Sequence, residues 1–309
     1  MIHSLLALPH ERPRPKFNLT QSNLNRCEKL ARENGQYGKA VRSLGSYGMA
    51  PACPETTEIL RQLHPAGPAL NLCDQFPEGL EFNPDNDKDI DSVIKQLHSF
   101  DKGTASGRSG LAVEHLLECC ASSMHSAVPD FRKNLVKFIN LFLSGKALPS
   151  FAPFMSSASL HSPYKKDGMS IRPIACGEIL RRLISKCCVS SVATQAMKHL
   201  CPIQVGVGVS NGPETIIHSF NRLIRDPQLC NDDTVIALLD FENAFNNIHR
   251  QNFLDEILRL FPSLYGWVQY TYGTGAKLFS GSDMIVASNG GQQGDPIAPL
   301  LFCLAAHPI

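Results

Sequence analysis

Residues 238–246 read LLDFENAFN, in which an apolar run reaches Asp240 and Phe245 follows five residues later. The run begins further back, as TVIALLDF at 234–241, and its nearly continuous apolar character predicts a strand buried on both faces. A carboxylate at the end of such a strand lies at the sheet edge where ligands collect, and Mg²⁺ prefers oxygen ligands. Aspartate also ends strands as a turn residue, so this stretch alone leaves both roles of Asp240 open.

A glycine-rich loop later in the chain, NGGQQGDPIAPLLF at 289–302, leads into an apolar helix. Its glycines allow a close approach of the backbone to a ligand, and Gln292 and Gln293 can hydrogen-bond base edges or sugar hydroxyls. Asp295 and Pro296 are typical of the N-cap and the first residue of a helix. An ordinary turn before a well-capped helix explains the same residues.

A third segment, ASLHSPYKKDGMSIRPIAC at 158–176, predicts two short strands around a Lys-Lys-Asp-Gly turn. Lys165, Lys166 and Arg172 flank this turn, where long cationic side chains suit phosphate groups and an arginine can fork onto two oxygens. Charged hairpin tips are also commonly just solvated, so this segment alone is a weak signal.

The remaining pattern indicates an α+β fold that is rich in helices. Apolar residues at helical spacing predict helices within 88–100, 113–120, 134–145, 177–200 and 249–262, and a hairpin is expected at 276–288. Residues 1–85 are rich in Pro, Gly and Asn, which predicts loops with short helices near 21–33 and 55–64. We therefore divide the chain into an N-terminal extension, 1–85, and a main unit, 86–309.

Composition and net charge indicate the cellular compartment of the protein but do not identify its binding partners. The formal net charge is +1, so any basic surface must be local. The chain has 11 cysteines and no CxxC pair, which indicates reduced thiols in an intracellular protein and no zinc site. The start has no cationic leader typical of a signal peptide, and no run approaches the roughly 18 apolar residues of a membrane span. We expect a soluble protein.

Taken together and in this order, the three segments resemble reverse transcriptases of retrotransposons that lack long terminal repeats. LLDFENAFNNIHR resembles the first catalytic motif of the palm, Asp-x-x-x-Ala-Phe, and QQGDPIAPLLFCLAAHPI resembles the following Gln-Gly-Asp-Pro motif. YKKDGMSIRPIACGEILRRLISK is similar to the fingers motif, and CPIQVGVGVSNGPETIIHSF to the linking segment. SGRSGLAVEHL resembles the upstream fingers element, with Arg108-Ser109-Gly110 in place of Pro-Asp-Gly. The resemblance covers roughly 86–309.

The resemblance implies right-hand polymerase fingers and a partial palm with a small, incomplete antiparallel sheet. Asp240 would be the catalytic carboxylate that binds two Mg²⁺ ions, or Mn²⁺, and the backbone carbonyl of Phe241 would ligate one of them. Phe245 would be the steric gate against a 2′-hydroxyl, although packing below the strand explains it as well. The implied partners are an RNA template, a DNA primer and deoxynucleoside triphosphates, and the nucleus is a compartment consistent with the family.

The resemblance also assigns the remaining polar side chains. Lys166 and Arg172 would grip the triphosphate, with Lys165 as the alternative to Lys166. Gln293 and Gly294 would contact the incoming nucleotide. The helix within 177–200 would present three cations to template phosphates on its polar face, although a solvated face explains them equally: Arg181, Arg182 and Lys186.

The pattern departs from the family after Gly294. An aromatic-x-Asp-Asp hairpin, expected tens of residues further on, does not occur before Ile309, and neither does a thumb. We therefore expect a fragment of a retroelement polymerase with an incomplete metal site and weak or no polymerisation by this chain alone. The alternatives are a derivative that binds RNA or hybrid duplex without chemistry, or a structural protein that kept the fold.

Overall fold

The computed structural model describes residues 20–32, 35–75, 77–121, 126–226 and 239–308. Its sheet has four strands in the order β2-β1-β3-β4: β1 Ala158–His161, β2 Ile174–Gly177, β3 Ala276–Ser280 and β4 Asp283–Ala287. The β1–β2 and β3–β4 pairs are the two expected hairpin pairings and run antiparallel. β1 and β3 run parallel, with Ala158 opposite Leu278, so the expectation of a purely antiparallel sheet is wrong. Parallel strands need a long crossover, and the helices between residues 179 and 272 supply it.

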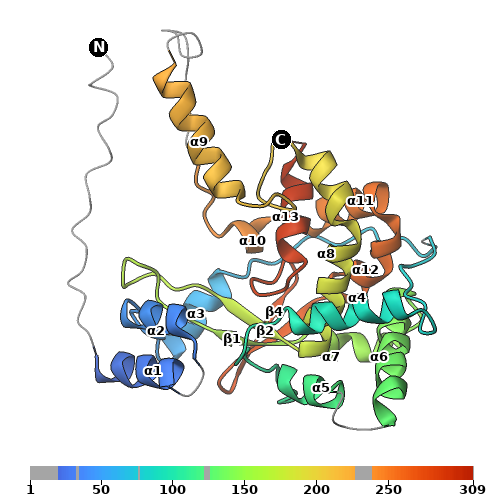
Figure 1. The fold of residues 1–309 in the computed structure, drawn as a ribbon. Coiled ribbons are helices and arrows are strands. Elements are labelled where there is room, and N and C mark those ends of the chain that lie inside the picture. The colour runs from blue at the N-terminus through green and yellow to red at the C-terminus, as the bar shows by residue number, and fades with distance from the viewer. Residues whose placement is uncertain (1–19, 33–34, 76, 122–125, 227–238, 309) are drawn as a thin grey trace.

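A helical core covers one side of the molecule (Figure 1). Its α-helices are α4 Asp87–His98, α5 Val113–Cys119, α6 Ala127–Leu143, α7 Ala152–Ser156, α8 Ile179–Leu200, α11 Arg250–Leu260, α12 Tyr265–Tyr272 and α13 Ala298–Ala306, with 3₁₀ turns at Pro149–Phe151 and Pro262–Leu264. α8 lies at the centre because Leu183, Ile184, Cys187 and Cys188 repeat at helical spacing and are all buried, as the sequence predicts. None of the described helices is long and apolar enough to span a membrane.

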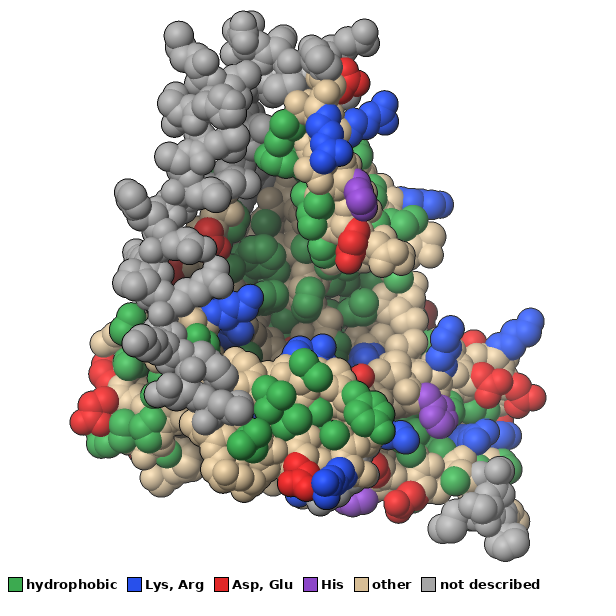
Figure 2. Space-filling view, turned by 60° about the vertical axis from the view of Figure 1, so that its left-hand side comes forward, with side chains coloured by type: hydrophobic (Ala, Val, Ile, Leu, Met, Phe, Trp, Pro, Cys, Tyr) green, Lys and Arg blue, Asp and Glu red, His purple; other side chains and the backbone are tan. Residues whose placement is uncertain are grey.

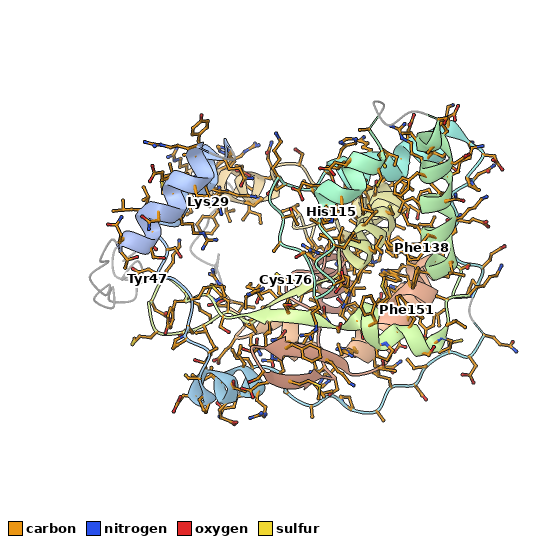
Figure 3. All side chains as sticks on the ribbon, turned by 90° about the horizontal axis from the view of Figure 1, so that it is seen from below. Lys29, Tyr47, His115, Phe138, Phe151 and Cys176 are labelled. Carbon is orange, nitrogen blue, oxygen red and sulfur yellow. The ribbon has the colours of Figure 1, made fainter. Side chains whose placement is uncertain are left out.

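The described residues of the N-terminal extension form three helices: α1 Gln21–Arg32, α2 Tyr37–Leu44 and α3 Pro54–Gln62. α1 and α3 confirm the two expected helices, whereas α2 lies where loop was expected, because its Ala40 and Ser43 find a buried environment. α3 packs Leu60 into a second, smaller core on one face of the sheet. Figure 3 shows the arrangement from below, with Lys29 and Tyr47 on one side and Cys176 of β2 in the middle.

Two further helices lie between α8 and α11 in the chain: α9 Gly212–Arg225 and α10 Ala244–Asn247. α9 projects from the body (Figure 1), and it buries only Gly212 among its own residues. Figure 2 shows one face of the molecule hollowed at its centre, with hydrophobic side chains deep in the hollow.

The strand expected before Asp240 is not seen in the described part of the chain. Its residues 234–238 lie outside that part, and 239–241 belong to no strand.

The side chain of Arg250, at the start of α11, joins two separate stretches of backbone, 272–274 and 287–290. It is 1% exposed, and its Nε donates to the carbonyl of Gly290 at 3.0 Å. Nη1 donates to the carbonyls of Tyr272 and Thr274 at 2.9 and 2.8 Å, and Nη2 donates to that of Ala287 at 2.9 Å. Burial lowers the pKa of Arg250 to about 10, which leaves the guanidinium charged at neutral pH. Arg250 therefore fixes α12, β4 and the loop after β4 relative to α11.

Arg250→Lys is predicted to destabilise the fold. Lysine keeps the charge but has three donors instead of five and no planar fork, so buried carbonyl oxygens lose their partners. We expect the free energy of unfolding, measured in urea, to fall by about 2–4 kcal/mol. The control is Arg259→Lys on the same helix, because Arg259 is exposed and its ion pair with Glu256 at the surface adds little to stability. Equal losses in both variants would contradict the role of Arg250.

Candidate functional site

A cavity of about 360 Å³ opens where three segments distant in sequence meet. Lys165 and Arg172 reach it from the turn between β1 and β2, Asp240 and Phe245 from the segment at α10, and Gln293 from the loop before α13. The other lining residues are Leu63, Ile171, Pro173, Glu242, Asn243 and Ala244. The fold thus assembles one pocket from the three segments that the sequence singled out, with cations and carboxylates on its walls.

The remaining predicted nucleotide-site residues lie at the edge of this cavity. Lys166 and Gly294 are exposed and are not part of its lining, so Lys165 is the turn lysine that faces the cavity. Phe241 is 60% exposed, and its ring lies 6.4 Å from that of Phe302 on α13. Asp240 is exposed to solvent at the cavity mouth.

Phe245 is half-buried: one side of its ring packs against a neighbouring aromatic ring, and the side chain also lines the cavity. Its ring centroid lies 5.4 Å from that of Phe302, which anchors α10 against α13. A side chain held on one side by the helix beneath it presents a rigid wall to the cavity on the other. The packing role and the proposed gating role of Phe245 are therefore compatible.

Two glycines bring the Gln293 loop into place. Gly290 has φ 66°, and a Cβ there would lie 2.4 Å from both Asn246 Cα and the carbonyl oxygen of Phe245. Gly294 has φ 132°, and its Cβ would lie 2.4 Å from the carbonyl oxygen of Ala175 on β2. No other residue combines these backbone angles with such close approaches at low cost. The backbone of the loop therefore packs closely against both α10 and β2.

A buried ion pair lies beneath the same loop. Arg181 is 0% exposed, and its Nη2 lies 2.8 Å from Asp295 Oδ2. Its Nη1 donates to Gln292 Oε1 at 2.7 Å and to the carbonyl of Ser156 at 2.8 Å, and the hydroxyl of Tyr272 donates to Asp295 at 2.9 Å. Burial, the largest single influence, lowers the pKa of Arg181, but the charges of Asp295 and Tyr272 and the hydrogen bonds to both side chains together raise it above its usual value.

This ion pair corrects two expectations. Arg181 does not lie on a polar face of α8 and does not reach solvent, so its expected contact with template phosphate is wrong. Asp295 was expected to be the N-cap of a helix that begins at Pro296, whereas α13 begins at Ala298; Asp295 Oδ1 accepts the N–H of Ile297 at 3.3 Å, and Oδ2 pairs with Arg181. A buried charge is stable only when it is paired, and the pair with Asp295 explains why Arg181 lies inside the protein.

The other two cations of α8 that were expected to contact template phosphates hold the loop that precedes α5. Arg182 is 8% exposed and donates to the carbonyl of Ala105, so its expected place on a solvent-facing helix surface is also wrong. Lys186 is half-buried and donates to the hydroxyl of Ser99 at 2.9 Å, and burial lowers the pKa of its amine. The structure uses both side chains to secure this loop against α8.

Three residues of the site escaped the sequence interpretation. Leu63, from the end of α3, lines the cavity, although we assigned no chemistry to the N-terminal extension. The side-chain amides of Asn243 and Asn246 each donate to the carbonyl of Leu63 at 2.8 Å. Asn243 has φ 51°, a left-handed conformation that asparagine tolerates better than most residues. The two asparagines therefore attach the extension to the wall of the cavity.

His64 is predicted to make the stability of this attachment depend on pH. It is 9% exposed, its Nδ1 lies 2.7 Å from the carbonyl of Leu60, and burial lowers its pKa from 6.5. The unfolded chain therefore binds the proton more tightly, so this stability is present above about pH 6.5 and is lost as pH falls below it. Urea unfolding at pH 7.5 and 5.5 should show a smaller pH effect for His64→Gln than for the wild type. The same pH effect in both proteins would contradict this prediction.

Gly290→Ala is predicted to displace the Gln293 loop. The new Cβ meets backbone atoms that cannot rotate away, and the left-handed φ adds strain, so we expect a loss of at least about 1–3 kcal/mol in unfolding free energy. Gly38→Ala in α2 is the control, because its nearest neighbour is the flexible Arg42 side chain at 4.0 Å. That change should be neutral or stabilising. If Gly290→Ala unfolds like the wild type, the loop is not held as described.

No family model matches this chain, and no curated protein matches it either. The function of the chain is therefore inferred from the order of its motifs and from the cavity that they form.

Proposed function

We propose that this chain carries the nucleotide-binding part of a retroelement-type reverse transcriptase and binds a deoxynucleoside triphosphate in the cavity lined by Arg172, Asp240 and Gln293. The observation that carries the proposal is the convergence of three motif segments, separated by tens of residues, on one cavity. In the complete enzyme the reaction would be RNA-directed DNA polymerisation, in which the primer 3′-hydroxyl attacks the nucleotide and pyrophosphate leaves.

The cavity offers charges of both signs at positions that suit this ligand. Lys165 and Arg172 supply cations for the triphosphate, and arginine can contact two phosphate oxygens at once. Gln293 supplies an amide for base or sugar, and Phe245 supplies the apolar wall against which the sugar would lie. Phosphate, sugar and base thus each have a complementary group.

The donor set fits Mg²⁺, which prefers oxygen ligands and commonly shares them with substrate phosphates. The residues that would hold the ion are Asp240 and the backbone carbonyl of Phe241, and the carboxylate of Glu242 lines the same cavity. When bound, the ion would neutralise triphosphate charge and lower the pKa of the attacking hydroxyl. The described residues gather no cluster of three His, Cys, Asp or Glu side chains, so we expect weak or no primer extension by this chain alone.

Binding of a fluorescent deoxynucleoside triphosphate with Mg²⁺ tests the proposal. Arg172→Ala and Lys165→Ala should each weaken binding about tenfold or more, since each removes a charge-assisted phosphate contact. Lys166→Ala is the matched control and should change affinity by less than about threefold, because that side chain does not line the cavity. Asp240→Asn should remove the dependence of binding on Mg²⁺.

Two results would overturn the proposal: no nucleotide binding by the wild type, or equal losses in Lys165→Ala and Lys166→Ala. Primer extension with Mg²⁺ that Asp240→Ala abolishes would retain the family assignment and refute the expected inactivity. Binding of RNA or hybrid duplex without any nucleotide binding would favour the alternative, a derivative that keeps nucleic-acid affinity without chemistry.

A further inference from the structure

A second cavity, of about 340 Å³, lies apart from the candidate nucleotide site and shares no lining residue with it. Three parts of the chain form its walls: the segment 49–52 with Thr56 from the N-terminal extension, Arg108 from the loop before α5, and the strand residues 159–162 and 279–281. It therefore lies where the N-terminal extension meets the central sheet.

The cavity lies beside the ends of β1 and β3 at the margin of the small core, because Leu160 of that core and Thr56 of α3 both contribute to its lining. Leu160 and Leu278 are buried against α3, and alternate residues of a strand point to opposite faces. Ser159, His161 and Phe279 thus face the other way and also line the cavity. The extension closes one edge, because the backbone N–H of Ala50 donates to the carbonyl of Ser162 at 2.8 Å.

Arg108 is held in position without being neutralised. Its guanidinium carbon lies 3.6 Å from the ring centroid of Phe279, so the planar group stacks on the aromatic face. Stacking uses the face of the guanidinium and leaves the N–H groups at its edge free to bind an anion. Arg108 is exposed and forms no ion pair with any described residue.

The rest of the lining has the chemistry of an anion site. His161 is the second basic side chain, and four hydroxyls are available as donors, from Thr56, Ser159, Ser162 and Ser280. No Asp or Glu lines the cavity, so nothing there competes with an incoming anion for Arg108. Hydroxyls and a forked arginine together are the donors that commonly bind phosphate oxygens.

We propose that this cavity binds a phosphate group, with Arg108 as the forked donor and His161 and the hydroxyls as supporting donors. The phosphate belongs either to a small phosphate ester or to the backbone of a nucleic-acid strand, since both present the same oxygens. The site stands independently of the proposed nucleotide function, because the two cavities have no residue in common. It also gives the N-terminal extension a role in ligand binding.

The test measures binding by the full chain of two probes, a short fluorescently labelled single-stranded RNA and a mononucleoside monophosphate without Mg²⁺. Arg108→Ala should weaken binding of the effective probe about tenfold or more. Arg108→Lys should recover only part of this loss, because lysine keeps the charge but not the fork or the stacking on Phe279. Arg26→Ala, an exposed arginine on α1 outside both cavities, is the control and should have less than about a threefold effect.

The probes distinguish the source of the phosphate. Loss of RNA binding alone in Arg108→Ala assigns the site to a nucleic-acid backbone, and loss of monophosphate binding assigns it to a small ester. The proposal is overturned if neither probe binds the wild type, or if Arg108→Ala and Arg26→Ala behave alike while thermal melting shows both folded. Nucleotide binding with Mg²⁺ should survive Arg108→Ala, so failure of this site and failure of the proposed function are separable.

Discussion

The arrangement of the segments around the Gln293 loop depends on a buried arginine that donates to backbone carbonyls and to no carboxylate among the described residues. Arg250 is 1% exposed and donates to the carbonyls of Gly290, Tyr272, Thr274 and Ala287. A buried charge with incomplete partners would cost several kcal/mol, so these segments must all be in place before the site is stable. Because Gly290 opens the loop that carries Gln293, the same constraint that orders the core also orders the cavity.

The loop of Gln293 is held from below as well as from its ends. Gly290 and Gly294 allow it to touch α10 and β2, while Arg181 and Asp295 form a fully buried pair underneath it. Such a pair adds little net stability compared with apolar packing, but it specifies one geometry, because either charge alone would be buried without a partner. The charged residues of this region thus position the loop, and those that meet solvent in the cavity come from other segments.

Local sequence patterns predicted many of the helices and strands of this structure. The features that they did not predict depend on contacts between residues far apart in the sequence. Turn residues, helical periodicity and glycine-rich loops depend on neighbours in sequence, so the β1–β2 hairpin, α8 and the β3–β4 hairpin appear as expected. The burial of Arg181 depends on Asp295, 114 residues later, and a helical pattern does not reveal that partner. Likewise, Leu63 enters the cavity because Asn246, 183 residues away, binds its carbonyl. The types of side chain at the site could therefore be predicted from the sequence, but which of these side chains are buried could not.

The two cavities differ in a way that predicts different ligands. The cavity of Asp240 combines carboxylates with Lys165 and Arg172, which suits a phosphate chain that arrives with a divalent cation. The cavity of Arg108 has basic side chains and hydroxyls but no carboxylate, so a divalent cation finds no anionic ligand there and a bare phosphate does. A chain with a net charge of only +1 can hold two such sites because each depends on local charge. The balance of carboxylates and cations at each cavity, rather than the overall charge, therefore distinguishes the two proposed ligands, one that binds with a divalent cation and one that binds without it.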